Sequence, residues 1–291
     1  MNNHFISLLT ATVFAFLGLC VTAQAGTGIT PPRVTLTADN IEGVLTITND
    51  RDVAAGYDIE ALGWEQEDDG KVLLPPTKGI RVEPSSLDIP AHGSAQIHIT
   101  ALVPAPESGH AEKVYRLRII ERGDRKREDS EKDVQVISSF TIPVFQKPLE
   151  TAHIGRLTNQ PLADGTLNFT VHNSGTEHTY VGEASVTGKD AKGVETFRIK
   201  RQGWYVLANG RLTFKAALSG EDCRSSRTIT LAARVLESDE TWVTDITPDP
   251  AQCGDGTVSE FPTGGLKKMP VGFKPGDQMP GGLKPLPPIK K

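Results

Sequence analysis

Apolar and polar residues alternate in short runs along the first half of the chain. Such runs occupy residues 33–37, 44–48, 96–100, 115–120 and 134–145. A period of two is typical of half-buried β-strands, because successive side chains point to opposite faces of a sheet. Gly, Pro, Asn and Asp residues separate the runs, and no run has a sustained helical period. The pattern predicts a β-sandwich in this half of the chain.

A second series of predicted strands follows. It comprises residues 166–172, 180–187, 195–199, 204–207, 211–216 and 228–236. Between the two series lies Pro148, which has no backbone N–H and cannot continue a central ladder. We therefore predict an all-β protein with one sandwich domain over residues 26–147 and a second over residues 148–253.

The two ends of the chain differ from the predicted domains. Residues 5–19 are apolar and precede an Ala-Gln-Ala sequence that ends at residue 25. This pattern predicts a secretory signal peptide over residues 1–25, with a short membrane anchor as the competing interpretation. Residues 254–291 are rich in Gly, Pro and Lys and hold too little apolar surface to fold. We expect a disordered tail, either simply solvated or in contact with a membrane surface or an acidic partner.

Export also determines how the cysteines are interpreted. Removal of residues 1–25 would leave Cys223 and Cys253 as the cysteines of the mature chain. Disulfides persist in oxidising compartments, so we predict a disulfide between these two residues. The sequence has no C-x-x-C or H-E-x-x-H motif and its histidines are scattered, so no metal site is predicted.

Charge and motifs exclude other functional classes. With a net charge of -5 over 291 residues, the chain lacks the basic excess that nucleic-acid binding requires. It has no G-x-S-x-G elbow, phosphate-binding loop or dinucleotide fingerprint, so neither an enzyme nor a cofactor is expected. The acidic residues around Asp68 are interpreted as a solvated hairpin turn, and Trp64, Trp204 and Trp242 as core anchors. A carbohydrate-binding sandwich, with the tryptophans stacked on sugars, is the alternative.

Five segments carry a resemblance to a known family. They are residues 32–34 (PRV), 79–84 (GIRVEP), 114–119 (VYRLRI), 142–148 (IPVFQKP) and 203–210 (GWYVLANG). In this order, residues 29–253 resemble the periplasmic chaperones of chaperone–usher pili. The resemblance implies two immunoglobulin-like sandwiches set at an angle, in a protein of the periplasm. It further implies that the protein stabilises pilus subunits by donor-strand complementation and delivers them to an outer-membrane usher. The alternative from another class is a secreted structural or adhesive β-sandwich protein of a surface appendage.

Members of this family lend an edge strand to their client, and residues 134–145 match that strand. Strand addition requires a long strand that is apolar on one face. Val134, Val136, Phe140, Ile142 and Val144 share that face. For the last three residues the alternative is that they complete the protein's own core, whereas the first two match positions that enter the client. An apolar edge is an aggregation hazard unless a partner covers it, so a self-capping dimer of the free protein stays open.

The family also implies an anchor for the client's terminal carboxylate, made by an arginine and a lysine. Arg33 matches the arginine, and its planar fork suits a bidentate carboxylate contact. An ordinary exposed arginine is the alternative. The position of the lysine falls on Pro143, which carries no charge. Either another cation such as Lys132 or Arg116 acts with Arg33, or this chain anchors its client differently.

A charged network joins the two domains in the family. By position, Glu112 and Lys147 match its first-domain members, and Glu237 or Asp239 matches the acid of the second domain. Exposed ion pairs contribute about 0 to 1 kcal/mol each. We therefore expect the network to fix the angle between the domains rather than to add stability.

Overall fold

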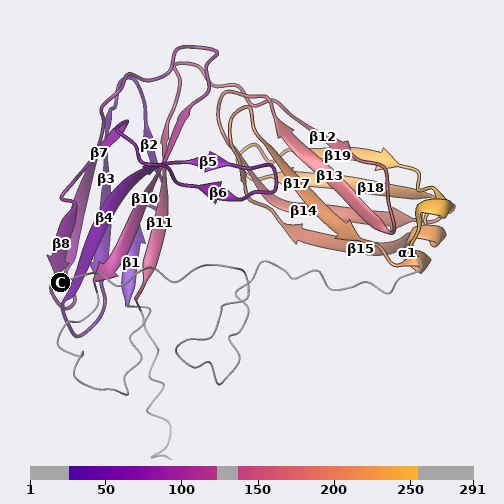
Figure 1. Ribbon diagram of the computed structural model, residues 1–291, viewed down its shortest axis with the longest axis horizontal. Helices are drawn as coiled ribbons and strands as arrows, with labels where there is room; N and C mark the ends of the chain where they lie inside the picture. Colours follow the sequence, from indigo (N-terminus) through magenta and orange to yellow (C-terminus); the bar gives the residue numbers. More distant parts are fainter. Residues whose placement is uncertain (1–25, 123–136, 255–291) are drawn as a thin grey trace, which may run out of the picture.

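The computed structural model describes residues 26–122 and 137–254, which form two β-sandwiches set at an angle (Figure 1). The predicted signal peptide, and the predicted tail beyond its first residue, lie outside the described residues. In the described part of the chain, no helix is long and apolar enough to cross a membrane.

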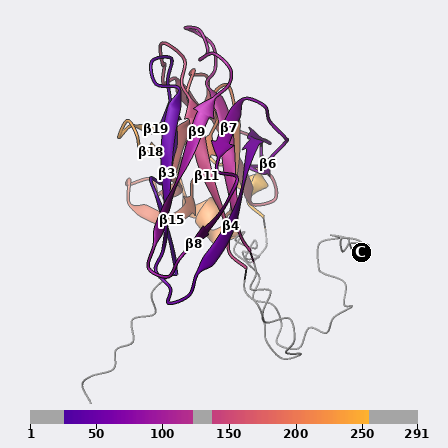
Figure 2. The same ribbon diagram turned by 90° about the vertical axis from the view of Figure 1, so that its left-hand side faces the viewer.

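The first sandwich is formed by strands that precede residue 147. These are β1 (Thr27–Thr30), β2 (Val34–Leu36), β3 (Glu42–Asn49), β4 (Ala55–Gly63), β7 (Ile80–Glu83), β8 (Ser86–Ile89), β9 (Ser94–Ala101), β10 (Lys113–Arg122) and β11 (Ser139–Gln146). One sheet has the order β1–β3–β9–β7 and the other β2–β11–β10–β4–β8; Figure 2 looks at the molecule from the side of this sandwich. The chain changes sheets between β1 and β2, which places β2 beside β11.

The alternating pattern of the sequence sorts side chains between this core and the outer faces. On β10, Leu117 and Ile119 are fully buried, and they meet Ile97 and Ile99 of β9 in one hydrophobic core. Arg118 lies between Leu117 and Ile119 on β10. Its side chain points to the outer face and pairs with Glu60. Burial of one face is what holds the strands in this register, because a slip by one residue would expose the whole apolar set.

The second sandwich follows from residue 155. Its strands are β12 (Gly155–Asn159), β13 (Thr166–Asn173), β14 (Thr179–Lys189), β15 (Glu195–Gln202), β16 (Tyr205–Val206), β17 (Arg211–Ala217), β18 (Thr228–Val235) and β19 (Thr241–Ile246). One sheet has the order β12–β13–β17; the other has the order β15–β14–β18–β19, with β16 also paired to β14. Phe169, Val171 and Leu231 are fully buried in its separate core.

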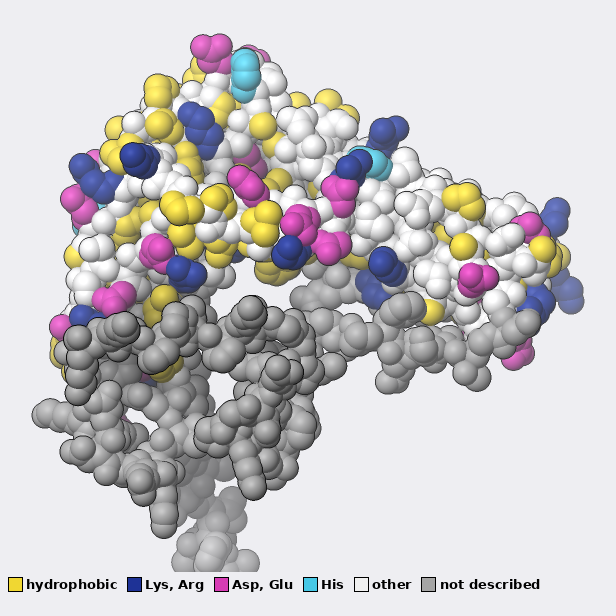
Figure 3. Space-filling view, viewed as in Figure 1, with side chains coloured by type: hydrophobic (Ala, Val, Ile, Leu, Met, Phe, Trp, Pro, Cys, Tyr) yellow, Lys and Arg dark blue, Asp and Glu magenta, His cyan; other side chains and the backbone are white. Residues whose placement is uncertain are grey.

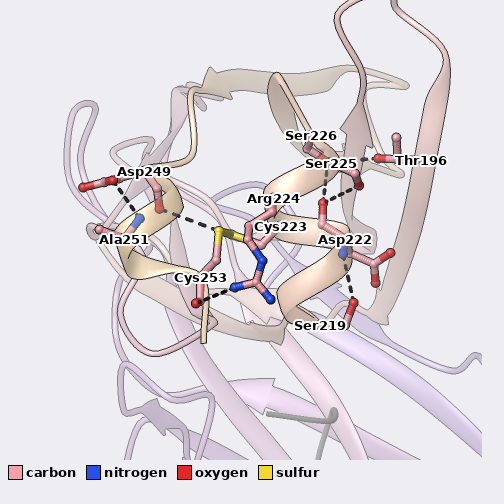
Figure 4. Close-up of a disulfide and its surroundings, with 10 residues drawn as sticks. All are labelled: Thr196, Ser219, Asp222, Cys223, Arg224, Ser225, Ser226, Asp249, Ala251 and Cys253. Carbon is pink, nitrogen blue, oxygen red and sulfur yellow. Dashed lines mark hydrogen bonds between the residues drawn. A yellow bond between two sulfur atoms is a disulfide. The ribbon is translucent and has the colours of Figure 1, made fainter. Parts of the chain in front are cut away.

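A disulfide closes the end of the second sandwich (Figure 4). Cys223 lies in the short helix α1 (Gly220–Ser225), and Cys253 follows the 3₁₀ helix η2 (Pro250–Gln252). Their bond confirms the predicted pair and joins residues 30 apart in the sequence. Both side chains are buried in the second core, and Arg224 Nη1 donates to the Cys253 carbonyl oxygen at 3.3 Å. The last residues of this domain are therefore tied to its core.

A hairpin formed by β5 (Glu65–Gln66) and β6 (Val72–Leu73) leaves the first sandwich and reaches the second (Figure 1). Gln66 Nε2 donates to the Tyr205 carbonyl oxygen at 2.7 Å. The backbone oxygen of Asp68 accepts from Thr213 N at 2.8 Å, and its carboxylate lies 2.6 Å from Arg211 Nε. The hairpin turn predicted around Asp68 is present, but its acid is not merely solvated, because it bridges the two domains.

Candidate functional site

One strand of the first sandwich has an unpaired edge. β11 pairs with β10 along its whole length, from Lys113–Gln146 to Ile120–Ser139. On its other side, β2 pairs with it in parallel only over residues 144–146. Within the described residues, the outer edge of residues 139–143 therefore has no strand partner. Such an edge presents free C=O groups, and N–H groups except at Pro143, to any strand that lies beside it.

The side chains of β11 divide between the protein's own core and the predicted donor role. Ile142 is 8% exposed and Val144 fully buried in the first core, and Phe140 packs against the same core. In the free protein this burial favours the alternative that Ile142 and Val144 complete its own core. The assignment of Val134 and Val136 falls outside the described residues.

Arg33 lies at this edge and already holds a carboxylate of the second domain. It directly precedes β2, whose Val34 is in register with Val144, so Arg33 stands level with Pro143. Its Nη1 atom is 3.2 Å from Glu237 Oε1, and the two side chains are 49% and 26% exposed. Glu237 Oε2 also accepts from the backbone N–H of Tyr180 at 3.0 Å. The predicted anchor thus reaches across the domain junction.

A crevice of 120 Å³ opens at this junction. Its lining combines basic, acidic and imidazole groups from both domains: Arg33, Thr35, Lys147, His153, Glu177, His178 and Glu237. The space-filling view shows apolar side chains on the front of the first sandwich, with acidic and basic groups among them toward the second (Figure 3). The domain junction is therefore lined by charged and polar groups, and it borders an apolar surface of the first sandwich.

Glu112 crosses the junction to a histidine that the sequence analysis did not single out. Glu112 Oε1 accepts from the backbone N–H of His178 at 2.5 Å and lies 2.8 Å from its Nδ1 atom. The Glu112 side chain is fully buried, and the His178 ring stacks on Phe145 with centroids 3.6 Å apart. A buried carboxylate requires such partners, because an unpaired one would lose its hydration without compensation.

Lys147 also crosses the junction, but to Glu177. Its Nζ atom is 2.6 Å from Glu177 Oε2, and His153 Nε2 is 2.5 Å from Glu177 Oε1. Burial alone would raise the pKa of the Glu177 carboxyl, but the hydrogen bond and charge of Lys147, with the charges of His153 and His178, hold it below its ordinary value. Glu177, rather than Glu237, is the second-domain acid that pairs with Lys147.

The predicted interdomain network is therefore corrected in its partners. Glu112, Lys147 and Glu237 all bridge the domains, yet each does so separately and none contacts another of the three. Asp239 instead pairs with Arg234 inside the second domain at 3.2 Å. The network predicted from position alone missed Glu177 and His178, which lie in the turn between the predicted strands 166–172 and 180–187. An acid in a short turn carries no pattern that distinguishes an ion pair from a solvated loop.

Arg116 lies on the other side of Pro143 from Arg33. It is paired in register with Pro143 on β10, so the two arginines flank the proline on one face of the sheet. Its guanidinium carbon lies 3.6 Å from the centroid of the Trp64 ring, a cation–π contact. Burial lowers the pKa of Arg116 to about 10, and the nearby Tyr205 counteracts part of that effect. Lys132, the other cation considered from the sequence, lies outside the described residues.

The tryptophans predicted as core anchors have different environments. Trp64 is buried, but it contacts Phe145 and Tyr205 at the domain junction. Trp204 is 38% exposed, so its assignment to the core is wrong. A Cβ on Gly203 would overlap the carbonyl oxygen of Val181, so only glycine fits at position 203. The next residue, Trp204, faces outward. Trp242 packs against the second core, as predicted.

Comparison with known proteins shows which solved structures share this architecture. No family model and no curated protein matches the sequence. The structure is similar to a chain of the CsuC–CsuE chaperone–tip adhesion subunit pre-assembly complex from archaic chaperone-usher Csu pili of Acinetobacter baumannii. The TM-score is 0.53 at 16% identity, over 77% of this chain and 100% of that one. A chain of the Salmonella enterica SafA pilin–SafB chaperone complex aligns with a TM-score of 0.49 and 14% identity, over 76% of this chain and 96% of that one. The protein therefore has the two-domain β-sandwich fold of chaperone–usher pilus chaperones, as the sequence resemblance implied.

Proposed function

We propose that this protein is a periplasmic chaperone that stabilises pilus subunits by donor-strand complementation and delivers them to an outer-membrane usher. The observation that carries the proposal is the unpaired edge of β11 over residues 139–143, beside Arg33, in a fold of two sandwiches. A strand edge bordered by a cation suits an extended chain segment with a carboxylate at its end.

The proposed capping step is a non-covalent strand exchange. A subunit that lacks one strand of its own sandwich leaves backbone groups and an apolar groove uncovered. The edge of β11 supplies N–H and C=O groups to that backbone, and Val134 and Val136 fill the groove. The buried Ile142 and Val144 hold β11 to its own domain while the edge is lent. No nucleotide or metal enters this step.

The carboxylate anchor in this proposal is Arg33. In the free protein it is engaged by Glu237, so a client carboxylate has to replace or join that pair. Because both side chains are partly exposed, the pair contributes only about 0 to 1 kcal/mol and is readily exchanged. A charge-assisted contact to a less solvated client carboxylate contributes about 1.5 to 3 kcal/mol, which favours the exchange.

The test is capture of the client from the native periplasm. The tagged protein should co-purify with a small protein in 1:1 ratio, identified by mass spectrometry, that has the pattern of an incomplete β-sandwich. Arg33→Ala should reduce the yield of that protein, whereas Arg81→Ala, an exposed arginine of β7 paired with Glu83, should not. Val136→Asp should abolish the complex, because it places a charge in an apolar groove.

Two outcomes would contradict the proposal. Recovery of the protein alone from the periplasm, together with its presence in sheared surface fibres, would identify it as a structural component of an appendage. Equal client yields for the Arg33→Ala variant and the wild type would remove Arg33 from the anchor.

A further inference from the structure

Positive charge gathers on one edge of the second sandwich. Residues 189–227 hold nine Lys and Arg residues against four Asp and Glu residues, a formal charge of +5 in a chain whose total is -5. Arg198 and Lys200 of β15 pair with neighbouring acids. Five further cations have no carboxylate within ion-pair distance among the described residues. They are Lys189, Lys192, Arg201, Lys215 and Arg227, here called the basic edge.

The basic edge follows β15 to the end of the second sandwich that lies away from the first, near α1 (Figure 1). Arg201 Nε donates to the Lys215 carbonyl oxygen at 3.3 Å, which joins β15 to β17 of the facing sheet. The backbone N–H of Arg227 donates to the Lys189 carbonyl oxygen at 2.7 Å. Six residues of β15 separate Arg201 from the position paired with Lys189, which corresponds to about 20 Å. Figure 3 shows basic side chains exposed at this end.

Protection of an edge strand explains only part of this charge. Cations on an exposed edge prevent another strand from pairing there, and Arg201 fits that role. Lys192, however, lies in the turn between β14 and β15, and Arg227 directly precedes β18, an inner strand of its sheet. Neither residue guards an edge that another strand could extend. Unpaired charge spread over about 20 Å is too broad for one small anion and suits an extended anionic surface.

The chain leaves the second sandwich at the same end. Gly254, the last described residue, lies against Gly165 and Gly220 and follows the disulfide at Cys253 (Figure 4). Residues 255–291 carry six lysines against three acids. Four of these lysines directly follow an apolar residue, in Leu266-Lys267, Phe273-Lys274, Leu283-Lys284 and Ile289-Lys290. Such pairs suit the surface of a bilayer, where the apolar group enters the acyl region and the cation meets the phosphates.

We propose that the basic edge and residues 255–291 together bind the surface of an anionic phospholipid bilayer. The proposal goes beyond the proposed function, because it concerns where the protein is held and not what it caps. Each Lys or Arg near such a surface strengthens binding about fivefold. Because β11 belongs to the other sandwich, its unpaired edge stays accessible while the basic edge is occupied.

The test is co-sedimentation with phospholipid vesicles of the protein purified from a periplasmic extract. Vesicles with about one third phosphatidylglycerol should bind the protein, and vesicles of phosphatidylcholine alone should not. A variant that combines Lys189→Gln, Lys192→Gln and Arg227→Gln should bind the anionic vesicles at least about tenfold more weakly. All three side chains are exposed, so the variant should melt at the temperature of the wild type.

The matched control removes the same charge from exposed positions of the first sandwich. It combines Lys71→Gln, Lys78→Gln and Arg81→Gln, and should bind the vesicles as the wild type does. Equal weakening by both triple variants would reduce the effect to net charge and overturn the proposal. Absence of binding to the phosphatidylglycerol vesicles would overturn it as well, and so would binding that is lost on truncation after Gly254 but unaffected in the basic-edge variant.

Soluble polyglutamate distinguishes a bilayer from an acidic polypeptide as the partner. A variant with Phe273→Ser and Leu283→Ser should bind the anionic vesicles more weakly and polyglutamate equally well, because only a bilayer takes up apolar side chains. Binding to polyglutamate without binding to vesicles would overturn the bilayer and assign the basic edge to an acidic protein. Client capture from the periplasm tests the proposed function separately, since none of these variants alters β11 or Arg33.

Discussion

Replacing Arg116 with methionine is expected to stabilise the free protein. Burial lowers the pKa of the guanidinium to about 10, well below its ordinary value. At 1.36 kcal/mol for each tenfold change in acidity, holding the charge at this position costs about 3 kcal/mol at neutral pH. The cation–π contact with Trp64 returns about 1 to 2 kcal/mol of that. Methionine keeps the apolar stem against Trp64 and has no charge to desolvate, so the free energy of unfolding should rise by about 1 to 2 kcal/mol.

The assay is equilibrium unfolding in urea, followed by circular dichroism and by tryptophan fluorescence. The gain should also raise the melting temperature by about 3 °C or more. Arg118→Met is the control: it removes a pair whose side chains are 40% and 50% exposed, and should cost at most about 1 kcal/mol.

A decrease of more than about 1 kcal/mol in the free energy of unfolding of Arg116→Met would contradict this expectation. Loss of an exposed ion pair costs no more than that, so a larger decrease would require a favourable interaction of the buried guanidinium. That result would mean that the Arg116 guanidinium is stabilised in the folded chain by more than its contact with Trp64.

Three further predictions concern the junction and the disulfide. The hydrogen bond and charge of Lys147 hold the pKa of the Glu177 carboxyl below its ordinary value, so its ionised form stabilises the junction above that ordinary value and the contribution is lost as the pH falls through the lowered pKa. Small-angle scattering should therefore show the domains separating in acid, and Glu177→Gln should remove this acid-dependent step. Replacing both Cys223 and Cys253 with alanine should lower the free energy of unfolding by about 3 to 4 kcal/mol in calorimetry, because the disulfide closes a 30-residue loop; an unchanged transition would contradict the loop-entropy account. Glu237→Gln should free Arg33 and raise client yield in the periplasmic capture, whereas Asp239→Asn, an acid two residues away that pairs with Arg234, should not.

Most strands could be predicted because the information for them is local. The alternation in residues 115–120 places Leu117 inward and Arg118 outward, and the structure has them so. The predicted ranges leave out β1, β4, β7 and β8 in the first sandwich and β12 and β19 in the second. In β12 and β19 the burial is only partial, so the alternation is weak. The disulfide was predictable for a different reason: the predicted removal of residues 1–25 leaves a single pair of cysteines, and therefore one pairing.

The candidate site was predictable only in part. Arg33 and Pro143 were identified by resemblance, but the partners of the charged residues were not. Arg33 pairs with a residue 204 positions away, and Glu112 with one 66 positions away. No periodic pattern constrains such distant pairs, because they depend on the angle at which two separately folded domains meet.

The sequence by itself determined that the chain is all-β, that it has two sandwiches, and which face of each strand is apolar. These properties follow from period-two alternation and from turn residues, which act within a few positions. The tertiary structure alone decided that Ile142 and Val144 belong to the protein's own core, that β11 keeps a free edge, and that Arg116 is buried without an acid. Burial and pairing depend on which strands lie next to one another. Those neighbours come from residues far apart in the sequence, which only the folded chain brings into register.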